Sequence, residues 1–426
     1  MNIKETLEYI HSVCWKGSRP GLERTRELLG MMGNPQDRLK YIHVAGTNGK
    51  GSVCSMLSSV LREAGYKTGL YTSPFVRYFN ERMVIDGQMI SDEELSEVTS
   101  YVKQFAEKMS DVPTEFELIT AIAFEYFSRN NCDIVVLETG MGGRLDSTNI
   151  IKTPVLSIIT GIALDHTAYL GDTIQKIARE KAGIIKNGIP VVFGGKSIEA
   201  YNAISEVAIE KESKLYTSSS QHLSNIEFSL YGCTLDCNEY KKLFVSLVGD
   251  YQPSNIATVL ESISVLKGAG YNLNESVVRG GLEKVYWPAR FEIINKDPLM
   301  IYDGAHNPEG LRACIDSVKR FFPNKKVNII SGVMADKNVG EMLPVISEVA
   351  NEAFTVIPDN PRSMDSKLYA EHFINYGINA YHFDSIEEGV RNALLASKRD
   401  DVPLIALGTL YMYGDVIEAL EKINNK

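Results

Sequence analysis

The residues best suited to chemistry form one glycine-rich run, Gly46-Thr47-Asn48-Gly49-Lys50-Gly51-Ser52. An apolar, strand-like segment (Tyr41–Ala45) precedes the run, and apolar residues at helical spacing follow it. Glycines let backbone N–H groups approach phosphate oxygens, a helix N-terminus adds its positive dipole end, and a lysine reaches the outer phosphates. The run therefore predicts a site for a nucleoside triphosphate, and a glycine-rich turn without a ligand is the alternative. It departs from the common phosphate loop because Gly51 separates Lys50 from Ser52, whereas a serine or threonine usually follows the lysine directly.

Length and composition limit the kinds of protein that the chain can be. A chain of 426 residues with 44% hydrophobic and 23% charged residues is typical of a globular protein with two or three domains. No segment approaches the roughly 20 apolar residues of a membrane span, and the N-terminus lacks the layout of a secretory signal. Of the six cysteines, Cys233 and Cys237 could form a metal pair, but no second pair completes a zinc site, so we expect free thiols. These features predict a cytoplasmic protein.

The net charge of −10 argues against a nucleic-acid partner, because such binding relies on clustered lysine and arginine. The net negative charge of the protein would repel both a triphosphate and an anionic substrate. Local lysines, arginines and metal ions are therefore expected to gather them.

The pattern of apolar segments predicts an α/β fold in two units. The expected parallel strands of the first unit are Tyr41–Ala45, Thr68–Tyr71, Ile134–Glu138, Val155–Thr160 and Pro190–Phe193. Helices are expected at Glu115–Ser128 and at Asn255–Leu266. A further helix is expected to start from a cap at Asp172, with Gln175 as its third residue. Short alternating segments between Leu215 and Val248 predict antiparallel strands.

A second βα series is expected to begin at Leu299–Tyr302, with further strands at Val327–Ser331, Ala353–Ile357 and Leu404–Leu407. We place the domain boundary near Trp287–Arg290, which gives domains 1–290 and 291–426. Because ligands of open α/β sheets gather at the carboxyl ends of the strands, the active site is expected in a cleft between the two units.

Several motifs, in one order along nearly the whole chain, carry a resemblance to a known family. They are the glycine-rich run, Ser73-Pro74-Phe75, Asn80-Glu81-Arg82, Glu138–Asn149, Leu164-Asp165-His166, Arg179–Ile184, Trp287–Glu292 and Tyr302–Pro308. The chain resembles the folylpolyglutamate synthase and dihydrofolate synthase family of the Mur ligase superfamily. The resemblance implies an N-terminal, mostly parallel P-loop-type domain and a smaller, Rossmann-like C-terminal α/β domain. It also implies ATP as a substrate and bound Mg²⁺, with two ions expected.

The family match assigns three metal ligands. Glu138 closes an apolar strand and opens a glycine-rich segment, where its carboxylate suits Mg²⁺, although a solvated strand-end glutamate is the alternative. His166 alone would be interpreted as an ordinary hydrogen-bonding residue, because magnesium prefers oxygen ligands. The resemblance makes Ser73, Glu138 and His166 the expected ligands.

Lys181 is expected on a partly apolar helix face with Ile174, Ile177 and Ala178. Burial lowers the pKa of a lysine, and a neutral amine reacts with CO₂. In the superfamily the matching lysine is carbamylated and helps to hold the second metal. We therefore expect a catalytic role for Lys181 through its carbamate, beside Lys50 and His166.

The resemblance assigns further nucleotide contacts near the second unit. Asn307 and Pro308 are typical of a helix start, whereas Asp303 and His306 are unexplained by local structure. In the family these two residues face the nucleotide across the cleft, and Asn255 and Arg290 match residues that contact ATP. The chain departs from the usual family pattern at four positions, where Tyr251 and Phe75 replace histidines, Ala289 replaces glycine and Thr409 replaces serine.

The acceptor pocket is assigned by the same resemblance. The pterin-contacting segments of the family match two segments that contain Thr114, Phe116, Glu117, Leu145, Asp146 and Ser147. The Phe116 ring could stack on the acceptor, and a role in the core of its helix is the alternative.

The function implied is ATP-dependent addition of L-glutamate to the carboxylate of a folate, through an acyl phosphate and without a side-chain nucleophile. Folate polyglutamylation is expected first, with dihydropteroate ligation alone or as a second activity of the same site. Three other classes stay open: a ligase for cell-wall precursors, a P-loop kinase or NTPase switch, and a degenerate binding protein. We expect a monomer.

Overall fold

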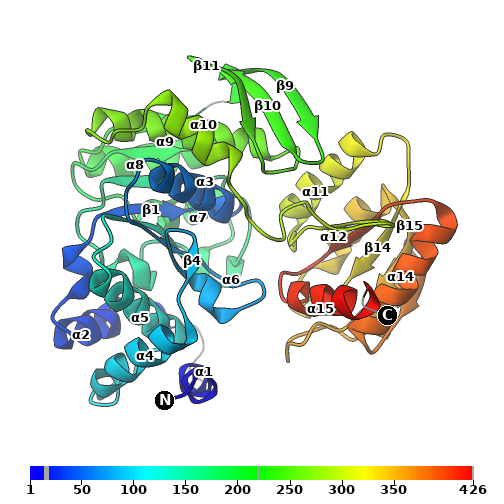
Figure 1. Cartoon of the computed structure of the whole chain (residues 1–426), viewed down its shortest axis with the longest axis horizontal. Coiled ribbons are helices and arrows are strands. Elements are labelled where there is room, and N and C mark those ends of the chain that lie inside the picture. Colours follow the sequence, from blue (N-terminus) through cyan, green and yellow to red (C-terminus); the bar gives the residue numbers. More distant parts are fainter. Residues whose placement is uncertain (14–18, 219, 425–426) are drawn as a thin grey trace.

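The computed structural model describes residues 1–13, 19–218 and 220–424. Figure 1 shows a larger N-terminal α/β part, a small antiparallel sheet above it, and a C-terminal α/β part (yellow to red) beside both.

The N-terminal part is built on an eight-stranded sheet with the order β4-β3-β2-β5-β1-β6-β7-β8. The strands are β1 (Tyr41–Ala45), β2 (Thr68–Tyr71), β3 (Met83–Ile85), β4 (Gln88–Met89), β5 (Ile134–Glu138), β6 (Leu156–Ile159), β7 (Val191–Phe193) and β8 (Leu215–Thr217). All neighbours from β2 to β8 pair in parallel, and β3 and β4 continue the sheet as antiparallel edge strands. The five predicted parallel strands are confirmed, with β6 one residue shorter at each end than predicted and β7 one residue shorter at its start.

Helices cover both faces of this sheet, which explains why its strands are apolar without alternation. In β5, Ile134 and Val136 pack on one face with α3, while Val135 and Leu137 pack on the other with α5. One face carries α3 (Lys50–Glu63), α9 (Gln252–Gly268) and α10 (Glu275–Glu283). The other carries α1 (Ile3–Ser12), α2 (Glu23–Met31), α4 (Asp92–Ala106), α5 (Glu115–Arg129), α7 (Ile174–Ala182) and α8 (Ile198–Glu210).

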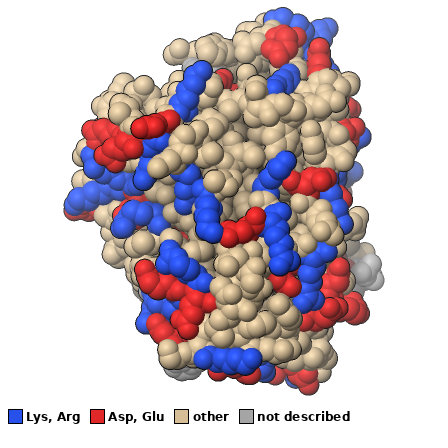
Figure 2. Space-filling view, turned by 90° about the vertical axis from the view of Figure 1, so that its left-hand side faces the viewer, with Lys and Arg blue, Asp and Glu red and all other residues tan. Residues whose placement is uncertain are grey.

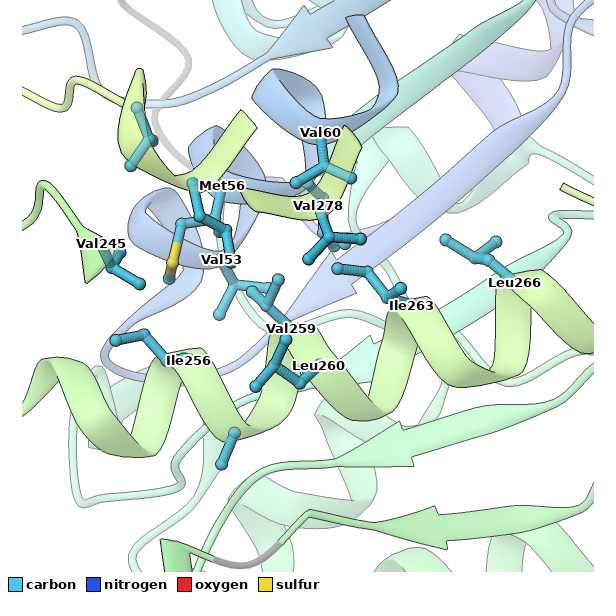
Figure 3. Packing of buried hydrophobic residues seen from close by; sticks show 14 of the residues in the cluster. Val53, Met56, Val60, Val245, Ile256, Val259, Leu260, Ile263, Leu266 and Val278 are labelled. Carbon is cyan, nitrogen blue, oxygen red and sulfur yellow. The ribbon is translucent and has the colours of Figure 1, made fainter. Parts of the chain in front are cut away.

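The helix that follows the glycine-rich run is held by the packing of three helices. Figure 3 shows Val53, Met56 and Val60 of α3 directed toward Val259 of α9 and Val278 of α10. All five side chains are fully buried, and burial of each such side chain stabilises the fold by about 1.5–3 kcal/mol. This packing fixes the N-terminus of α3, and therefore the position of the glycine-rich run.

Two local predictions are corrected by the structure. The cap of α7 is Thr173, whose hydroxyl accepts a hydrogen bond from the Lys176 backbone N–H, so Gln175 is the second helical residue and not the third. Asp172 lies outside the helix and forms an ion pair with Lys176.

The predicted antiparallel segment also begins later than expected. A three-stranded sheet contains β9 (Leu223–Ser229), β10 (Gly232–Cys237) and β11 (Tyr240–Val245). β8 pairs in parallel with β7 instead, and so it belongs to the large sheet.

The C-terminal part contains a six-stranded sheet with the order β12-β13-β17-β14-β15-β16. Its strands are β12 (Glu292–Lys296), β13 (Leu299–Tyr302), β14 (Val327–Ser331), β15 (Ala350–Thr355), β16 (Asn379–His382) and β17 (Leu404–Leu407). Helices α11 (Pro308–Phe321), α12 (Val339–Ser347) and α13 (Ser366–Asn375) cover one face, and α14 (Ile386–Asp400) and α15 (Tyr413–Asn424) cover the other. β15 starts three residues earlier than predicted, and the mostly exposed edge strand β16 was not predicted because it lacks a buried apolar run.

Charges of both signs are mixed on the face shown in Figure 2, where blue and red side chains lie side by side. Among the helices of the described parts, none combines the length and the apolar character needed to cross a membrane. Within the same parts the five cysteines, which include Cys233 and Cys237, are free and buried.

Candidate active site

The glycine-rich run leaves the end of β1 and enters α3, as predicted. Gly49 caps the helix with φ of 87°, and Gly46 has φ of 153°. A Cβ at Gly46 would lie 1.7 Å from the Thr160 hydroxyl, and one at Gly49 would lie 2.4 Å from Oδ1 of Asn255. Glycine is therefore required at both positions, for space as well as for the left-handed backbone.

The segment that follows β6 fixes the shape of this loop. The Thr47 backbone N–H donates to the Gly161 carbonyl oxygen at 2.8 Å, and the Thr160 hydroxyl donates to the Asn48 carbonyl oxygen at 2.7 Å. The Thr47 hydroxyl is bonded to the backbone of Ala163. The loop is thus held open before a ligand arrives, which lowers the entropy cost of phosphate binding.

Lys50 and Glu138 face each other at the carboxyl ends of β1 and β5. The Lys50 ammonium lies 3.8 Å from Oε1 of Glu138 and donates a 3.3 Å hydrogen bond to the Thr47 carbonyl oxygen. Oε2 of Glu138 accepts a 3.3 Å hydrogen bond from the Ser73 backbone N–H. Burial raises the pKa of the Glu138 carboxyl, while the nearby charge of Lys50 acts in the opposite direction. The carboxylate is buried with one long ion pair and one long hydrogen bond, so it is suited to receive a cation.

His166 lies at the start of the short helix α6 (Thr167–Leu170) and adopts φ of 49°. Its backbone N–H donates to Oδ1 of Asp165 at 2.9 Å. Partial desolvation lowers the pKa of the imidazole, and Asp165 acts in the opposite direction, which favours the neutral ring with a free lone pair.

Lys181 of α7 is buried, with 4% of its surface exposed, and its side-chain nitrogen donates a 2.7 Å hydrogen bond to the Gly46 carbonyl oxygen. Burial lowers the pKa of this amine to about 7, and the charge of Lys50 acts in the same direction. A substantial fraction of the amine is therefore neutral near pH 7, as reaction with CO₂ requires.

The C-terminal part contributes side chains directly to the loop. Nδ2 of Asn48 donates a 2.7 Å hydrogen bond to Oε2 of Glu309, in the first turn of α11. Nδ2 of Asn307, the cap of that helix, donates to Oδ1 of Asn48 and to Oδ2 of Asp165, each at 3.3 Å. The Lys337 ammonium lies 3.8 Å from Oδ1 of Asp165. Five side chains, in four contacts, thus join the two parts beside the phosphate loop.

Asp303 is an organising residue of the same cleft. Oδ2 accepts hydrogen bonds from the Tyr251 hydroxyl (2.9 Å) and from the Phe291 backbone N–H (3.0 Å), and Oδ1 accepts one from Ala305. Burial raises the pKa of this carboxyl, and Arg290 acts in the opposite direction. Tyr251 therefore supplies a hydrogen bond between the two parts of the chain.

His306 and Arg290 lie nearby. Nδ1 of His306 lies 2.8 Å from the Gly304 carbonyl oxygen, and burial lowers the pKa of the ring to about 4, so the imidazole is neutral. The Arg290 guanidinium donates to the Ala289 carbonyl oxygen at 3.0 Å, and Ala289 itself adopts φ of 55°.

A cavity of about 540 Å³ lies between the parts, and all predicted nucleotide and metal residues line it. They are Thr47, Asn48, Gly49, Lys50, Gly51, Ser52, Ser73, Glu138, His166, Lys181, Asn255, Arg290, Asp303 and His306. The geometry brings together residues that are spread over more than 250 positions of the sequence.

A second cavity, of about 1440 Å³, adjoins the first, because both are lined by Ser73, Pro74 and His166. The residues predicted to contact the acceptor line this cavity: Thr114, Phe116, Glu117, Leu145, Asp146 and Ser147. The Phe116 ring is half-buried and approaches Gly140, where a Cβ would lie 2.5 Å from the ring.

Two of these six residues have carboxylates that are already occupied. Glu117 is buried, forms a bidentate pair with Arg24 at 2.8 and 2.9 Å, and accepts a hydrogen bond from the Thr114 backbone N–H. Asp146 accepts hydrogen bonds from the backbone N–H groups of Met141 and Thr148 and from the Thr148 hydroxyl. The carboxylate of Glu117 fixes the start of α5, and that of Asp146 fixes the turn after β5, so both shape the cavity wall.

Several residues of the site were not predicted from the sequence. Glu309 and Lys337 join the two parts, and Trp287 covers Gly51, where a Cβ would lie 2.8 Å from the indole ring. The Trp287–Glu292 motif contained a signal for Trp287, whereas Glu309 looked like an ordinary helix-start acid. Nothing local in the sequence distinguishes Lys337.

Comparisons with known proteins agree with this geometry. Residues 44–263 match the Mur ligase middle domain, and residues 289–406 match the glutamate ligase domain of Mur ligases. The fold and the site thus define an ATP-dependent amide-bond-forming ligase of the Mur type.

Within that class, full-length relatives identify a narrower group. The chain is 37% identical to a folylpolyglutamate synthase of Lacticaseibacillus casei, over 99% of both chains. It is 33% identical to a dihydrofolate synthase/folylpolyglutamate synthase of Bacillus subtilis, over 98% of this chain and 99% of the relative. The chain belongs to the folylpolyglutamate synthase/dihydrofolate synthase family, and it is a ligase that adds glutamate to folates.

Solved structures show the same likeness. A Mycobacterium tuberculosis folylpolyglutamate synthase complexed with ADP and AMPPCP superposes with a TM-score of 0.90 at 26% identity, covering 100% of this chain and 99% of the other. Escherichia coli FolC in complex with DHPP and ADP superposes with a TM-score of 0.87 at 28% identity, covering 100% and 98%.

Proposed function

We propose that the chain extends the glutamyl tail of reduced folates, with dihydropteroate ligation as a second activity of the same site. The observation that carries the proposal is the pair of adjoining cavities, one lined by the phosphate loop and one lined by the predicted acceptor residues. An acceptor carboxylate at their junction would meet the terminal phosphate of ATP. The preference for folate over dihydropteroate as the acceptor is supported by the 37% identity to a relative that is named for polyglutamylation alone.

The reaction follows from the chemistry of a carboxylate, which is a poor electrophile because oxide would have to leave. An acceptor carboxylate oxygen takes the γ-phosphoryl group of ATP, and ADP departs, leaving an acyl phosphate. The glutamate amine attacks the acyl carbon, inorganic phosphate departs with the bonding electron pair, and the amine loses a proton. No enzyme nucleophile takes part.

The residues of the nucleotide cavity take roles that fit this reaction. Backbone N–H groups of Asn48 to Ser52 would bind phosphate oxygens, and Thr47 would hold the loop in shape. Lys50 and Arg290 would offset charge at the transferring group. Asn255, Asp303 and His306 would hold the nucleotide between the two parts of the chain.

The donor set also fits Mg²⁺. Glu138 is a buried carboxylate with an incompletely satisfied charge, and Ser73 adds an oxygen. His166 in its neutral form adds a nitrogen. Among the described residues, no group of three His, Cys, Asp or Glu side chains could hold a metal alone. This agrees with the usual coordination of Mg²⁺ by one or two carboxylates, water and substrate phosphates. Bound Mg²⁺, with two ions proposed, would offset the charge of the phosphates.

Lys181 is proposed to be carbamylated. Its neutral amine would add to CO₂ with loss of one proton, and the remaining N–H could still donate to the Gly46 carbonyl oxygen. The product is an anion close to Lys50, and it would help to hold a second cation.

For the acceptor, Phe116 would stack on a flat ring, while Thr114, Leu145 and Ser147 would bound the pocket. Glu117 and Asp146 would act through the local structure that they fix. We further propose that the protein is a cytoplasmic monomer. Its proposed domains are 1–290 and 291–426, and this boundary is supported by the start of the C-terminal sheet at β12, directly after it.

Incubation with ATP, Mg²⁺ and labelled L-glutamate, with tetrahydrofolate, dihydropteroate, a murein precursor or no acceptor, tests the proposal. Glutamylated tetrahydrofolate as the main product supports it. Product from dihydropteroate alone would reverse the order of acceptors. ADP release with the murein precursor alone, or equal release without any acceptor, would indicate a cell-wall ligase or an NTPase.

A further inference from the structure

Arg82 lies at the wall of the acceptor cavity, and its guanidinium forms no ion pair with any of the described residues. It ends the turn Phe79–Arg82 that precedes β3, and it lines the larger cavity together with Ser73 and Phe116. Nε and Nη1 of its guanidinium are enclosed and have no hydrogen-bond partner within the described part of the chain. Enclosed donors of a charged group that stay unpaired cost more than those of neutral groups, so an unpaired guanidinium at a binding cavity indicates a missing ligand.

The acid nearest in sequence cannot serve as the partner. Both oxygens of Glu81 accept hydrogen bonds from backbone N–H groups of the same loop, those of Val76, Arg77 and Tyr78. The Glu81 carboxylate is therefore used to shape the loop, and it leaves the charge of Arg82 available.

Two aromatic rings hold the guanidinium in place. Its central carbon lies 5.2 Å from the ring centroid of Phe75 and 5.6 Å from that of Phe79. Such contacts orient an arginine without neutralising it. The group is thus fixed before an anion arrives, which lowers the cost of binding.

The position of Arg82 identifies the anion. Arg82 lines the acceptor cavity and not the nucleotide cavity, while Ser73 lines both. Its charge also reaches Glu138, whose pKa is raised by burial and is lowered by Lys50 and, more weakly, by Arg82. Arg82 therefore lies on the acceptor side of the place where the phosphoryl group is transferred.

We propose that Arg82 binds the acceptor carboxylate that receives the phosphoryl group, through the part of its guanidinium that lines the acceptor cavity. This inference rests on the proposed function, and it adds a residue that orients the reacting group. The acceptor carboxylate, ATP and Glu138 are all negatively charged, so they repel one another when the carboxylate approaches. The positive charge of Arg82 offsets this repulsion from the acceptor side. A lysine would keep the charge but lose the planar group that the two rings hold in place.

The test compares pteroate with its primary carboxamide as ligands of the ADP-bound enzyme. The wild type is expected to bind the carboxylate about tenfold to a hundredfold more tightly than the amide, as a charge-assisted hydrogen bond implies. Arg82→Gln should abolish this preference, and Arg82→Lys should keep part of it. ADP affinity should stay unchanged in both variants, which also shows that they are folded.

Arg77 supplies a matched control on the same loop. It also stacks on a ring, that of Tyr78 at 5.0 Å, and has an enclosed Nε without a partner, but its Nη2 pairs with Glu421 at 3.1 Å and it lines neither cavity. Arg77→Gln should retain the full preference for the carboxylate.

Steady-state kinetics show whether Arg82 binds the reacting carboxylate or another carboxylate of the acceptor. Dihydropteroate has one carboxylate, and folate monoglutamate has two. Arg82→Gln should raise the KM for both substrates by similar factors, and it should leave the KM for ATP unchanged. A rise for folate alone would overturn the assignment to the reacting carboxylate, and an unchanged preference for carboxylate over amide would overturn the role of Arg82. A wild type that binds no pteroate at all would instead refute the proposed function.

Discussion

The side-chain amine of Lys181 donates a 2.7 Å hydrogen bond to the carbonyl oxygen of Gly46, the first residue of the phosphate loop. One buried lysine thereby connects α7 to the loop and presents its nitrogen to the nucleotide cavity. The same burial that lowers the pKa of this amine to about 7 makes it reactive toward CO₂.

This pKa gives the stability of the protein a particular dependence on pH. Between pH 7 and the ordinary value of 10.5, the unfolded chain holds a proton on Lys181 that the folded chain has lost. Stability from this group therefore rises with pH across that window and is lowest below pH 7. In CO₂-free buffer, Lys181→Met should raise Tm relative to the wild type most at pH 6.5, and the difference should shrink by pH 9. A difference that does not change with pH would show that the amine titrates normally.

Lys50→Ala should lower the rate of ligation by about 10²–10³ while the fold is kept, because it removes a fixed charge that offsets phosphate charge. Single-turnover measurements of ADP formation are the appropriate readout. Lys152→Ala is a control, since Lys152 is exposed and pairs with Asp37 away from both cavities. Near-normal turnover of the Lys50 variant would contradict the assignment of the phosphate loop.

Glu138→Gln and His166→Ala should shift the magnesium dependence of the reaction to higher concentrations, with partial rescue by excess Mg²⁺. Glutamine keeps the shape of Glu138 but removes the charge that attracts a cation. Titration of activity with Mg²⁺ at saturating ATP measures the shift. If both titration curves coincide with that of the wild type, these side chains are not ligands.

Gly49→Ala should weaken ATP binding and lower Tm. The new Cβ would lie 2.4 Å from Oδ1 of Asn255, and the backbone at φ of 87° strains any side chain, at a cost of about 1–2 kcal/mol. Gly268→Ala, at the end of α9 with open space around its Cα, is the matched control and should be close to neutral. Equal effects of the two substitutions on ATP affinity would contradict the tight packing at Gly49.

Ala289→Gly should raise Tm slightly. Ala289 is fully buried and adopts φ of 55°, a conformation that costs a residue with a Cβ about 1–2 kcal/mol. Greater freedom of glycine in the unfolded chain offsets about 0.4–1 kcal/mol of this gain. Thermal unfolding of the two proteins measures the balance, and a lower Tm in the glycine variant would show that the methyl group contributes packing that outweighs the strain.

The sequence predicted the β1–loop–α3 unit well, because its strand, glycines and helix each carry a local signal. It predicted β15 three residues late and missed β16, since an edge strand with exposed residues has no continuous apolar run. It placed the α7 cap at Asp172 because Asp and Thr are both good caps, and only the backbone geometry shows that Thr173 serves.

Prediction of the site was limited in a different way. Lys50 could be proposed from its type and surroundings, whereas the roles expected for Glu138 and Lys181 depended on the resemblance to the family. The Asn48–Glu309 and Tyr251–Asp303 hydrogen bonds could not be predicted, because they depend on how two separately folded sheets approach each other. The hydrogen bonds that occupy the carboxylates of Glu117 and Asp146 could not be predicted either, because they depend on where the folded chain places the donor groups.

The direct hydrogen bonds between the phosphate loop and α11 have a consequence for successive additions. Residues of both parts line the nucleotide cavity, and residues of both parts also line the acceptor cavity, to which the C-terminal part contributes Met334, Lys337 and Leu410. Separation of the two parts would break the Asn48–Glu309 hydrogen bond and would open both cavities together. We expect that spent nucleotide and glutamylated product leave through the same opening, so that glutamylation of long tails is distributive rather than processive.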